Sequence, residues 1–265
     1  MRTLWFAAAL AMSATPALRS EIHDVLKNAE IQDGLAKVKG SLTIHQRPNF
    51  SISLNSQEVG KGAPETHDGA DEVLFIRRGS GLLWLEDRKY EVGSGDVINV
   101  RRKTAHHMDA PSGRIEYVAV RIFPTGEGGS AIGIRPAARI MSDVLRASEI
   151  SETLSKFDSN QPIHSAPNFT MNYVIYKGRV GPWEAHHGCV DIYFLRMGTA
   201  VAQIGGQIRD AKEESPGEPR GSGVTGARRH EIGPGDIVLI PRDTAHHMDP
   251  GAAKLGYLLM KIWAE

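Results

Sequence analysis

Carboxylate and imidazole side chains recur in this chain as two sets of four with similar spacing. The sets are Glu65, His67, Glu72 and His106 in the first half, and Glu184, His186, Asp191 and His246 in the second. In each set the first two residues are two positions apart, so on an extended strand their side chains point to the same face. Gly69 allows a tight turn, after which Glu72 starts the next strand beside them.

Two imidazoles and two carboxylates form a nitrogen and oxygen ligand set. Such a set suits Mn, Fe, Zn, Ni or Co, whereas a single cysteine, Cys189, cannot supply a thiolate cluster. Four side chains leave one or two coordination positions open to substrate or water. The sequence therefore predicts a divalent transition metal in at least one half of the chain. The alternative is that the glutamates are strand-edge charges and that each histidine is hydrogen-bonded without a metal.

An internal repeat relates the two sets. At an offset of 119 residues, segment 48–50 recurs unchanged at 167–169. Further along, the offset becomes 140, and the six residues 104–109 recur unchanged at 244–249. A run of six identities at matched positions indicates a duplicated domain. The 21 additional residues of the second copy fall near 206–228, and their Gly, Pro, Ser and charged composition predicts a surface loop.

Each copy opens with an apolar pattern near helical spacing, at 25–35 and at 144–154, and then continues in short apolar runs. In the first copy the predicted strands are 50–54, 73–76, 81–85, 97–100 and 115–120. Short strands between Gly, Asp and Pro turns predict a small barrel or sandwich in each copy. Two domains follow, at 18–135 and 136–265.

Some of these runs, such as 73–76 and 258–260, need apolar cover on both faces. The other copy can provide that cover, so a compact monomer is sufficient, and a homo-oligomer remains open. The chain carries 31 basic and 31 acidic residues, which gives no electrostatic reason to expect nucleic acid or an anionic membrane surface as a partner. A small molecule is the expected ligand.

The N-terminus has the order of a secretory signal. Arg2 is followed by an uncharged apolar stretch, residues 3–12, and then by small residues that place a cut after Ala17. The stretch is too short to span a bilayer, and the alternative is a buried helix or an apolar tail. We expect residues 1–17 to be a signal peptide and the mature protein to be periplasmic or secreted, with no membrane association after cleavage.

These motifs resemble those of the two-domain cupins, or bicupins. The resemblance lies in Glu65-Thr66-His67 with Glu72, in Gly95-Asp96 through His106, and in the same motifs of the second copy. It implies an all-β fold of two tandem jelly-roll barrels, each preceded by a short helical segment. It also implies a divalent metal held at Glu65, His67, Glu72 and His106, and at Glu184, His186, Asp191 and His246. Glutamate replaces the first histidine of the family motif in both copies, and Asp191 replaces a glutamate.

Other matched residues are expected to be structural. His107 and His247 should point away from the site and bond at a strand end, and Cys189 should be a small buried residue rather than a redox thiol. Arg77 and Arg196 are expected on the strand surface, although an inward arginine could bind a substrate carboxylate.

The resemblance implies an exported metal-dependent enzyme that acts on a small oxygen-rich or carboxylate-bearing molecule. Dioxygenases, decarboxylases, isomerases and lyases all occur on this site, so the fold does not select the reaction. No further catalytic residue stands out. A non-catalytic periplasmic binding or sensing bicupin is the alternative, because the chain has no separate nucleophile constellation or cofactor fingerprint. A third possibility is that one copy is catalytic and the other structural.

Overall fold

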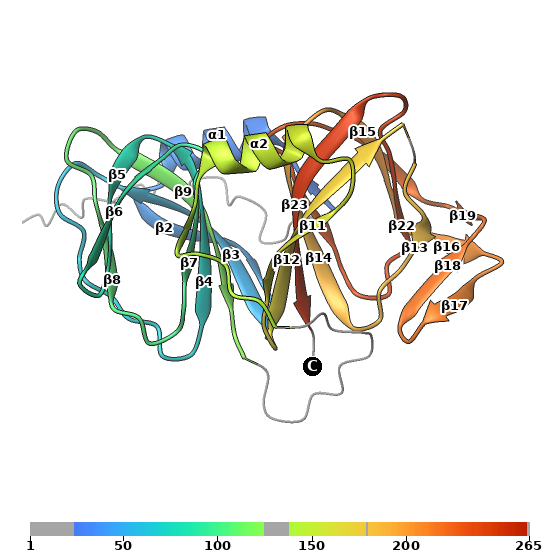
Figure 1. Cartoon of the computed structure of the whole chain (residues 1–265), viewed down its shortest axis with the longest axis horizontal. Helices are drawn as coiled ribbons and strands as arrows, with labels where there is room; N and C mark the ends of the chain where they lie inside the picture. The colour runs from blue at the N-terminus through green and yellow to red at the C-terminus, as the bar shows by residue number, and fades with distance from the viewer. Residues whose placement is uncertain (1–23, 125–137, 179, 264–265) are drawn as a thin grey trace, which may run out of the picture.

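Two β barrels lie side by side, and two short helices run along one edge of the pair (Figure 1). The computed structural model describes residues 24–124, 138–178 and 180–263. The expected all-β fold of two barrels, each preceded by a helix, is confirmed. The expected signal peptide at 1–17 and the expected domain boundary at 135/136 lie outside the described residues. Within the described ranges, no helix has the length and apolar character needed to cross a bilayer.

The first barrel consists of a large sheet and a small one. Its strands are β2 Gly40–Gln46, β3 Phe50–Gln57, β4 Asp71–Arg78, β5 Ser80–Leu85, β6 Arg88–Gly93, β7 Val97–Val100, β8 His106–Asp109 and β9 Ile115–Ile122. The large sheet contains β7-β4-β9-β3-β2, and the small sheet has the order β6-β5-β8. All five strands predicted in this copy are present, and each is up to three residues longer at either end than its apolar run.

The second barrel repeats this plan. Its strands are β11 Gln161–Ser165, β12 Phe169–Lys177, β13 Trp183–Glu184, β14 Cys189–Met197, β15 Ala200–Ile204, β20 Arg228–Ile232, β21 Ile237–Ile240, β22 His246–Asp249 and β23 Lys254–Trp263. The large sheet contains β21-β14-β23-β12-β11. The other sheet contains β13-β22-β15-β20, and two strands of the inserted segment extend it beyond β13.

The inserted segment is not a surface loop. It forms four short strands, β16 Gln207–Arg209, β17 Lys212–Ser215, β18 Glu218–Gly221 and β19 Gly223–Thr225. β18 pairs with β13, with Glu184 opposite Arg220. The polar composition predicted a loop because most side chains of this segment are exposed. The segment forms strands because its backbone pairs with β13, and side-chain composition does not indicate such pairing.

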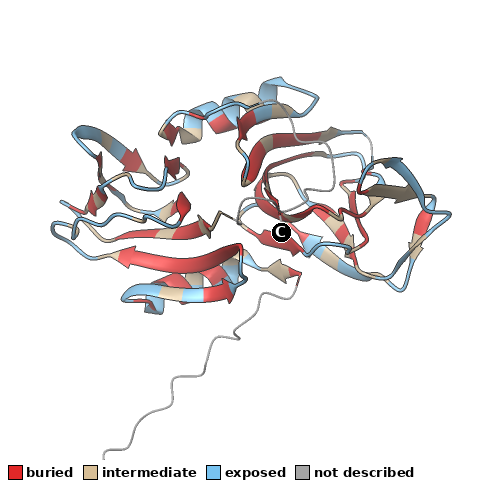
Figure 2. Ribbon diagram, turned by 90° about the horizontal axis from the view of Figure 1, so that it is seen from below, coloured by how far each residue is buried: buried red, intermediate tan, exposed pale blue. Residues whose placement is uncertain are grey.

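The two large sheets are buried on both faces. In β4, Val73 and Phe75 point to a core between the barrels, whereas Leu74 and Ile76 point into the first barrel. The core between the barrels collects buried residues from both large sheets and both helices, and each barrel has a smaller core of its own. Buried residues accordingly fill the central strands in Figure 2. The expectation that each copy covers the apolar runs of the other is confirmed.

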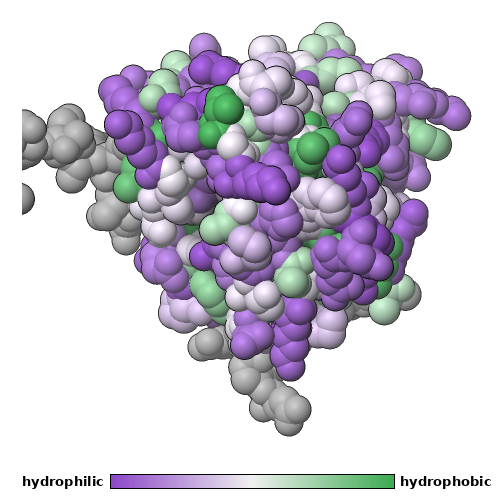
Figure 3. All heavy atoms as spheres, turned by 90° about the vertical axis from the view of Figure 1, so that its left-hand side faces the viewer, coloured by the Kyte–Doolittle hydropathy of each residue, from purple (hydrophilic) through white to green (hydrophobic). Residues whose placement is uncertain are grey.

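Equivalent residues of the two copies meet at the centre of this interface. The rings of Phe75 and Phe194, which match at the offset of 119, stack with centroids 3.6 Å apart. The two barrels are thus related by an approximate two-fold axis. By contrast, the far end of the first barrel presents mostly hydrophilic residues with single hydrophobic ones scattered among them (Figure 3).

The segment before each helix joins the opposite barrel. β1 (Val25–Leu26) pairs with β21, and β10 (Val144–Leu145) pairs with β7. The apolar spacing predicts that these pairs belong to the helices, but α1 (Asn28–Lys37) and α2 (Ala147–Lys156) begin only after them. The free edge of the opposite sheet captures the pairs as strands, because tertiary pairing outweighs a weak local preference.

Each helix is also capped by the opposite barrel. The backbone N–H of Asn28 donates to Asp236 Oδ1 at 2.7 Å, and that of Ala147 donates to Asp96 Oδ1 at 2.8 Å. A carboxylate at a helix N-terminus satisfies otherwise unpaired N–H groups and the positive end of the helix dipole. Lys27 completes the first cap by donating to Asp236 Oδ2. The repeated Gly-Asp pairs therefore connect the two halves of the chain.

We expect the substitution Asp236→Ala to lower the free energy of unfolding by about 2 kcal/mol, because it removes a buried helix cap. The matched control is Asp33→Ala, which breaks an exposed pair with Lys37 on the same helix and should cost less than about 0.5 kcal/mol. Urea unfolding followed by circular dichroism measures both. Equal losses in the two variants would contradict a capping role for Asp236.

Candidate metal centres

The first candidate centre lies where two extended segments meet inside the first barrel. Glu65 and His106 form a β bridge in which each backbone N–H donates to the other residue's carbonyl at 2.9 Å. His67 follows two residues after Glu65 on the same face, as the alternation predicts. One ligand atom from each of these three residues lies within 4.8 Å of the others. We call Glu65, His67 and His106 the first triad.

The ring nitrogens of the first triad face its carboxylate. His67 Nε2 and His106 Nε2 each lie 3.5 Å from a Glu65 oxygen. His106 Nδ1 lies 3.0 Å from the carbonyl oxygen of Thr104. Because a carbonyl only accepts, Nδ1 carries the proton, which leaves Nε2 as the ligand atom when the ring is neutral. The repeated Thr-Ala-His sequence thus orients the imidazole.

The fourth predicted ligand, Glu72, faces the first triad but is paired with a base. Its Oε2 atom lies 3.5 Å from His106 Nε2, and its Oε1 atom accepts a hydrogen bond from Arg121 Nε at 2.8 Å. Arg121 stands opposite Glu72 in the pairing of β9 with β4. Its Nη2 atom also lies 3.0 Å from His67 Nε2. The guanidinium therefore contacts His67 Nε2, the nitrogen to which a metal ion would bind.

The second triad, Glu184, His186 and His246, repeats this arrangement. Glu184 on β13 pairs with His246 on β22, and the three ligand atoms again lie within 4.8 Å of one another. His246 Nδ1 lies 3.0 Å from the carbonyl oxygen of Thr244, so Nε2 is again the ligand atom. His246 Nε2 is buried and makes no hydrogen bond with the described part of the chain.

Asp191, the fourth predicted ligand of this set, also carries a basic partner. Lys261 Nζ lies 3.2 and 3.3 Å from the two Asp191 oxygens, and Tyr193 donates its hydroxyl to the same carboxylate. Asp191 and Lys261 are opposite one another in the pairing of β14 with β23. His186 Nε2 lies 3.4 Å from Asp191. The assignment of Glu72 and Asp191 as ligands remains a prediction.

The inserted strands contribute two side chains to the second centre. Glu218 Oε2 lies 2.6 Å from His186 Nδ1, and Arg220 donates to Glu184 Oε2 at 3.1 Å. The Glu218 contact is an ion pair when His186 is protonated. The first copy lacks the insertion, and its triad is more open. The Glu65 side chain is 47% exposed, whereas that of Glu184 is 16% exposed.

The electrostatics of each centre give one charged and one neutral imidazole. Burial alone would lower the pKa of His106, but contacts with the Glu65 and Glu72 carboxylates outweigh it and raise the pKa to about 9. Burial and the charge of Arg121 lower the pKa of His67. In the second centre, Asp191 and Glu218 overcome burial and raise the pKa of His186 to about 9. Burial and the charge of His186 lower the pKa of His246.

Both donor sets fit a divalent ion. Each joins two imidazoles to a carboxylate, and one ring of each pair, His106 or His246, is held by a backbone carbonyl at Nδ1. The fit also differs between the copies in what the base opposite the fourth carboxylate contacts. In the second centre the base is held on Asp191, whereas in the first centre Arg121 also contacts His67 and would have to release it.

The remaining matched residues are structural. His107 stacks on Trp84, and His247 stacks on Trp183 and contacts the Pro182 carbonyl, so both point away from the triads. Cys189 is buried, and burial together with the Asp191 charge raises the pKa of its thiol. Thiolate reactivity is not expected there.

The prediction that Arg77 lies on the strand surface is wrong. Its guanidinium donates to the Gly235 carbonyl and to the Asn28 side chain, so it joins the first barrel to the capped helix. Burial and the charge of Arg77 lower the pKa of Arg196, the matched arginine of the second copy, to about 10. Neither arginine faces a triad.

Four contributors were missed from the sequence. Arg121 and Lys261 could have been found, because they match at the offset of 140 and stand opposite the fourth carboxylate of each set. Glu218 and Arg220 left no signal, since the insertion has no counterpart in the first copy.

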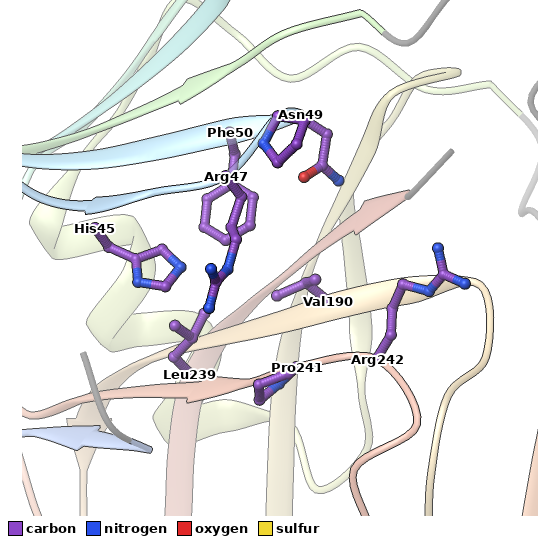
Figure 4. A pocket seen from close by; sticks show the side chains of 9 residues that line it. His45, Arg47, Asn49, Phe50, Val190, Leu239, Pro241 and Arg242 are labelled. Carbon is purple, nitrogen blue, oxygen red and sulfur yellow. The ribbon is translucent and has the colours of Figure 1, made fainter. Parts of the chain in front are cut away.

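A cavity of about 290 Å³ lies at the seam between the barrels rather than at a triad. Figure 4 shows Arg47 and Asn49, from the turn between β2 and β3, across from Val190 and Leu239 of the second barrel. At the equivalent position on the opposite side of the interface, the first copy has Asp71 where the second has Val190. Asp71 pairs with Asn168 and Arg102. The cavity is therefore a local asymmetry of the interface, and none of the triad residues lines it.

Comparison with known proteins supports the fold. Residues 54–121 match the Cupin domain family. A curated relative, an uncharacterized protein of Methanocaldococcus jannaschii, is 37% identical over 43 residues, which are 16% of this chain and 34% of the relative. The chain thus spans about a third of the length of that relative.

Solved structures match over nearly the whole chain. A cupin 2 conserved barrel domain protein from Leptotrichia buccalis has a TM-score of 0.64 at 12% identity, with 91% of this chain and 97% of that one covered. Salicylate 1,2-dioxygenase from Pseudaminobacter salicylatoxidans has a TM-score of 0.67 at 11% identity, with 99% and 89% covered. A mutant of that dioxygenase, solved in complex with gentisate, matches with a TM-score of 0.66 at 9% identity, with 95% and 84% covered. At these identities the likeness concerns the fold. Residues 54–121 thus match a Cupin domain, and the chain as a whole has the two-barrel fold of these cupin structures.

Proposed function

We propose that this protein is a metal-dependent bicupin enzyme that acts on a small oxygen-rich or carboxylate-bearing molecule. The observation that carries the proposal is the repeated triad of one glutamate and two histidines, with ligand atoms within 4.8 Å of one another in both barrels. In the first barrel both Nε2 atoms are turned to the Glu65 carboxylate, an arrangement that suits ligands of one shared ion.

The substrate class follows from two supports. A bound divalent ion would supply Lewis-acid or redox chemistry at an open coordination position, which suits oxygen-rich ligands. A matched dioxygenase structure holds gentisate, a small aromatic carboxylate. Dioxygenase or decarboxylase chemistry is the type that we favour.

The first centre is the better candidate for turnover. Glu65 is exposed, whereas Glu184 is covered by the inserted strands and held by Arg220. Among the triad residues, His106 would orient and hold the ion through Nε2, and Glu65 would supply a carboxylate ligand at the mouth. The second centre, closed by β18, suits a structural ion.

A non-catalytic binding or sensing module is the second candidate. The observation in its favour is the contact of Arg121 with His67, since the first triad is neutralised without a metal. Incubation of metal-loaded protein with salicylate, gentisate and aliphatic hydroxy acids distinguishes the enzyme from the binding module. Product detected by mass spectrometry supports the enzyme, whereas binding without conversion supports the module.

We expect natively purified protein to hold about two equivalents of a transition metal, because both triads have suitable donors. His67→Ala/His106→Ala and His186→Ala/His246→Ala should each remove roughly one equivalent. Plasma mass spectrometry measures the content. Less than about 0.2 equivalents in the wild type, after expression with metal supplementation, would refute the metalloenzyme.

The two centres should release metal at different rates. In His186→Ala/His246→Ala, which keeps only the more exposed first triad, a chelator should extract the ion about tenfold faster than in His67→Ala/His106→Ala, a barrier difference of about 1.4 kcal/mol. Stopped-flow measurement with a chromogenic chelator gives both rates. Equal rates would contradict closure of the second centre by the inserted strands.

We also propose that the protein is exported, on the support of the basic, apolar and small-residue order of residues 1–17. Expressed in a bacterium with a periplasm, the full chain should yield a mature form that starts at Leu18. N-terminal sequencing of the periplasmic fraction tests this, and recovery only of uncleaved chain from the cytoplasm would contradict it.

A further inference from the structure

Arg121 differs from its counterpart Lys261 in what it touches. Both bases stand opposite the fourth carboxylate of their set on neighbouring strands. Lys261 Nζ contacts Asp191 and also Cys189 Sγ, 3.7 Å away. Arg121 bonds Glu72 through Nε and still reaches His67 and Glu65 through Nη2, at 3.0 and 3.8 Å.

The shape of the two side chains explains the difference. Lysine ends in one compact ammonium group, whereas arginine carries a planar fork whose nitrogens can serve two partners at once. The Nε contact keeps the guanidinium on Glu72, so the outer nitrogen can leave His67 while the side chain remains anchored. Arg121 is also 39% exposed, against 18% for Lys261.

From this contrast we propose that Arg121 is the residue of the first centre that binds the carboxylate of the substrate, and that His67 would release Arg121 for this role on ligating a metal ion. The inference rests on the proposed metal site of the first triad. A metal needs the His67 Nε2 lone pair that now faces Arg121 Nη2. The released guanidinium nitrogen would belong to a side chain that is 39% exposed, and guanidinium groups pair with carboxylates through two parallel hydrogen bonds.

The same contact predicts competition between Arg121 and the metal. In the background His186→Ala/His246→Ala, which keeps only the first centre, Arg121→Gln should bind Co²⁺ about tenfold more tightly than the background itself. Arg121→Lys should also tighten binding, because lysine is accepted at the matched position of the second barrel without contacting a triad histidine. A gain in the lysine variant separates the His67 contact from a simple loss of charge. The control is Arg102→Gln, which removes a nearby charge paired with Asp71 and should leave the affinity unchanged.

Binding of a carboxylate by Arg121 is tested through its effect on Co²⁺ affinity. Acetate should increase the Co²⁺ affinity of the background, since ligands that favour one another's binding do so reciprocally, whereas acetamide should not. In Arg121→Gln and Arg121→Lys the acetate effect should be lost or reduced several-fold. Visible absorption of Co²⁺ follows each titration at constant ionic strength, and circular dichroism confirms that each variant is folded.

The outcomes are distinguishable. Unchanged Co²⁺ affinity in both Arg121 variants would overturn the competition, and an acetate effect of the same size in them would overturn carboxylate binding by Arg121. If neither the background nor its Arg121 variants bind Co²⁺, the metal site of the first triad fails, and the inference fails with it. Co²⁺ bound by the background but lost in His67→Ala/His106→Ala/His186→Ala/His246→Ala would show that the proposed site itself stands.

Discussion

Burial of the two large sheets on both faces is the constraint on which the rest of the structure depends. The alternation of β4 sends Val73 and Phe75 to the core between the barrels and sends Leu74 and Ile76 inward. Glu72 shares the inward face, so the chemistry-bearing side chains are turned into the barrel by the same alternation that forms the interface. A shift of one residue in register would bury these carboxylates between the barrels and expose the phenylalanines to the barrel interior.

This constraint also explains why the two halves exchange their N-terminal segments. The interface covers one face of each large sheet, but the backbone groups at the sheet edge still need partners. β1 and β10 supply them across the interface, and Asp96 and Asp236 then cap the helices that follow. Pairing, capping and apolar contact thus act at the same boundary, which favours folding of the two barrels as one unit.

Much of this arrangement could be read from the sequence, and the failures have physical reasons. The repeat, the strands and the triads depend on local alternation and on spacing, which the sequence carries directly. The strand β1 was missed because its partner β21 is about 210 residues away, and apolar pairs such as Val25-Leu26 suit a helix or a strand. Glu218 was missed because only the tertiary position of β18, beside β13, brings its carboxylate to His186.

The duplicated centres differ because buried carboxylates must be compensated within an apolar barrel. Each barrel places a base directly across from the fourth carboxylate, so neither Glu72 nor Asp191 carries an unpaired buried charge. In the second barrel, Lys261 compensates the charge of one carboxylate, Asp191. The inserted strands cover the triad carboxylate Glu184 of the same centre. Compensation by arginine in the first barrel extends to the triad itself and reaches the mouth. The same requirement of charge balance is therefore met by a largely buried base in the second centre and by a half-exposed base beside Glu65 in the first.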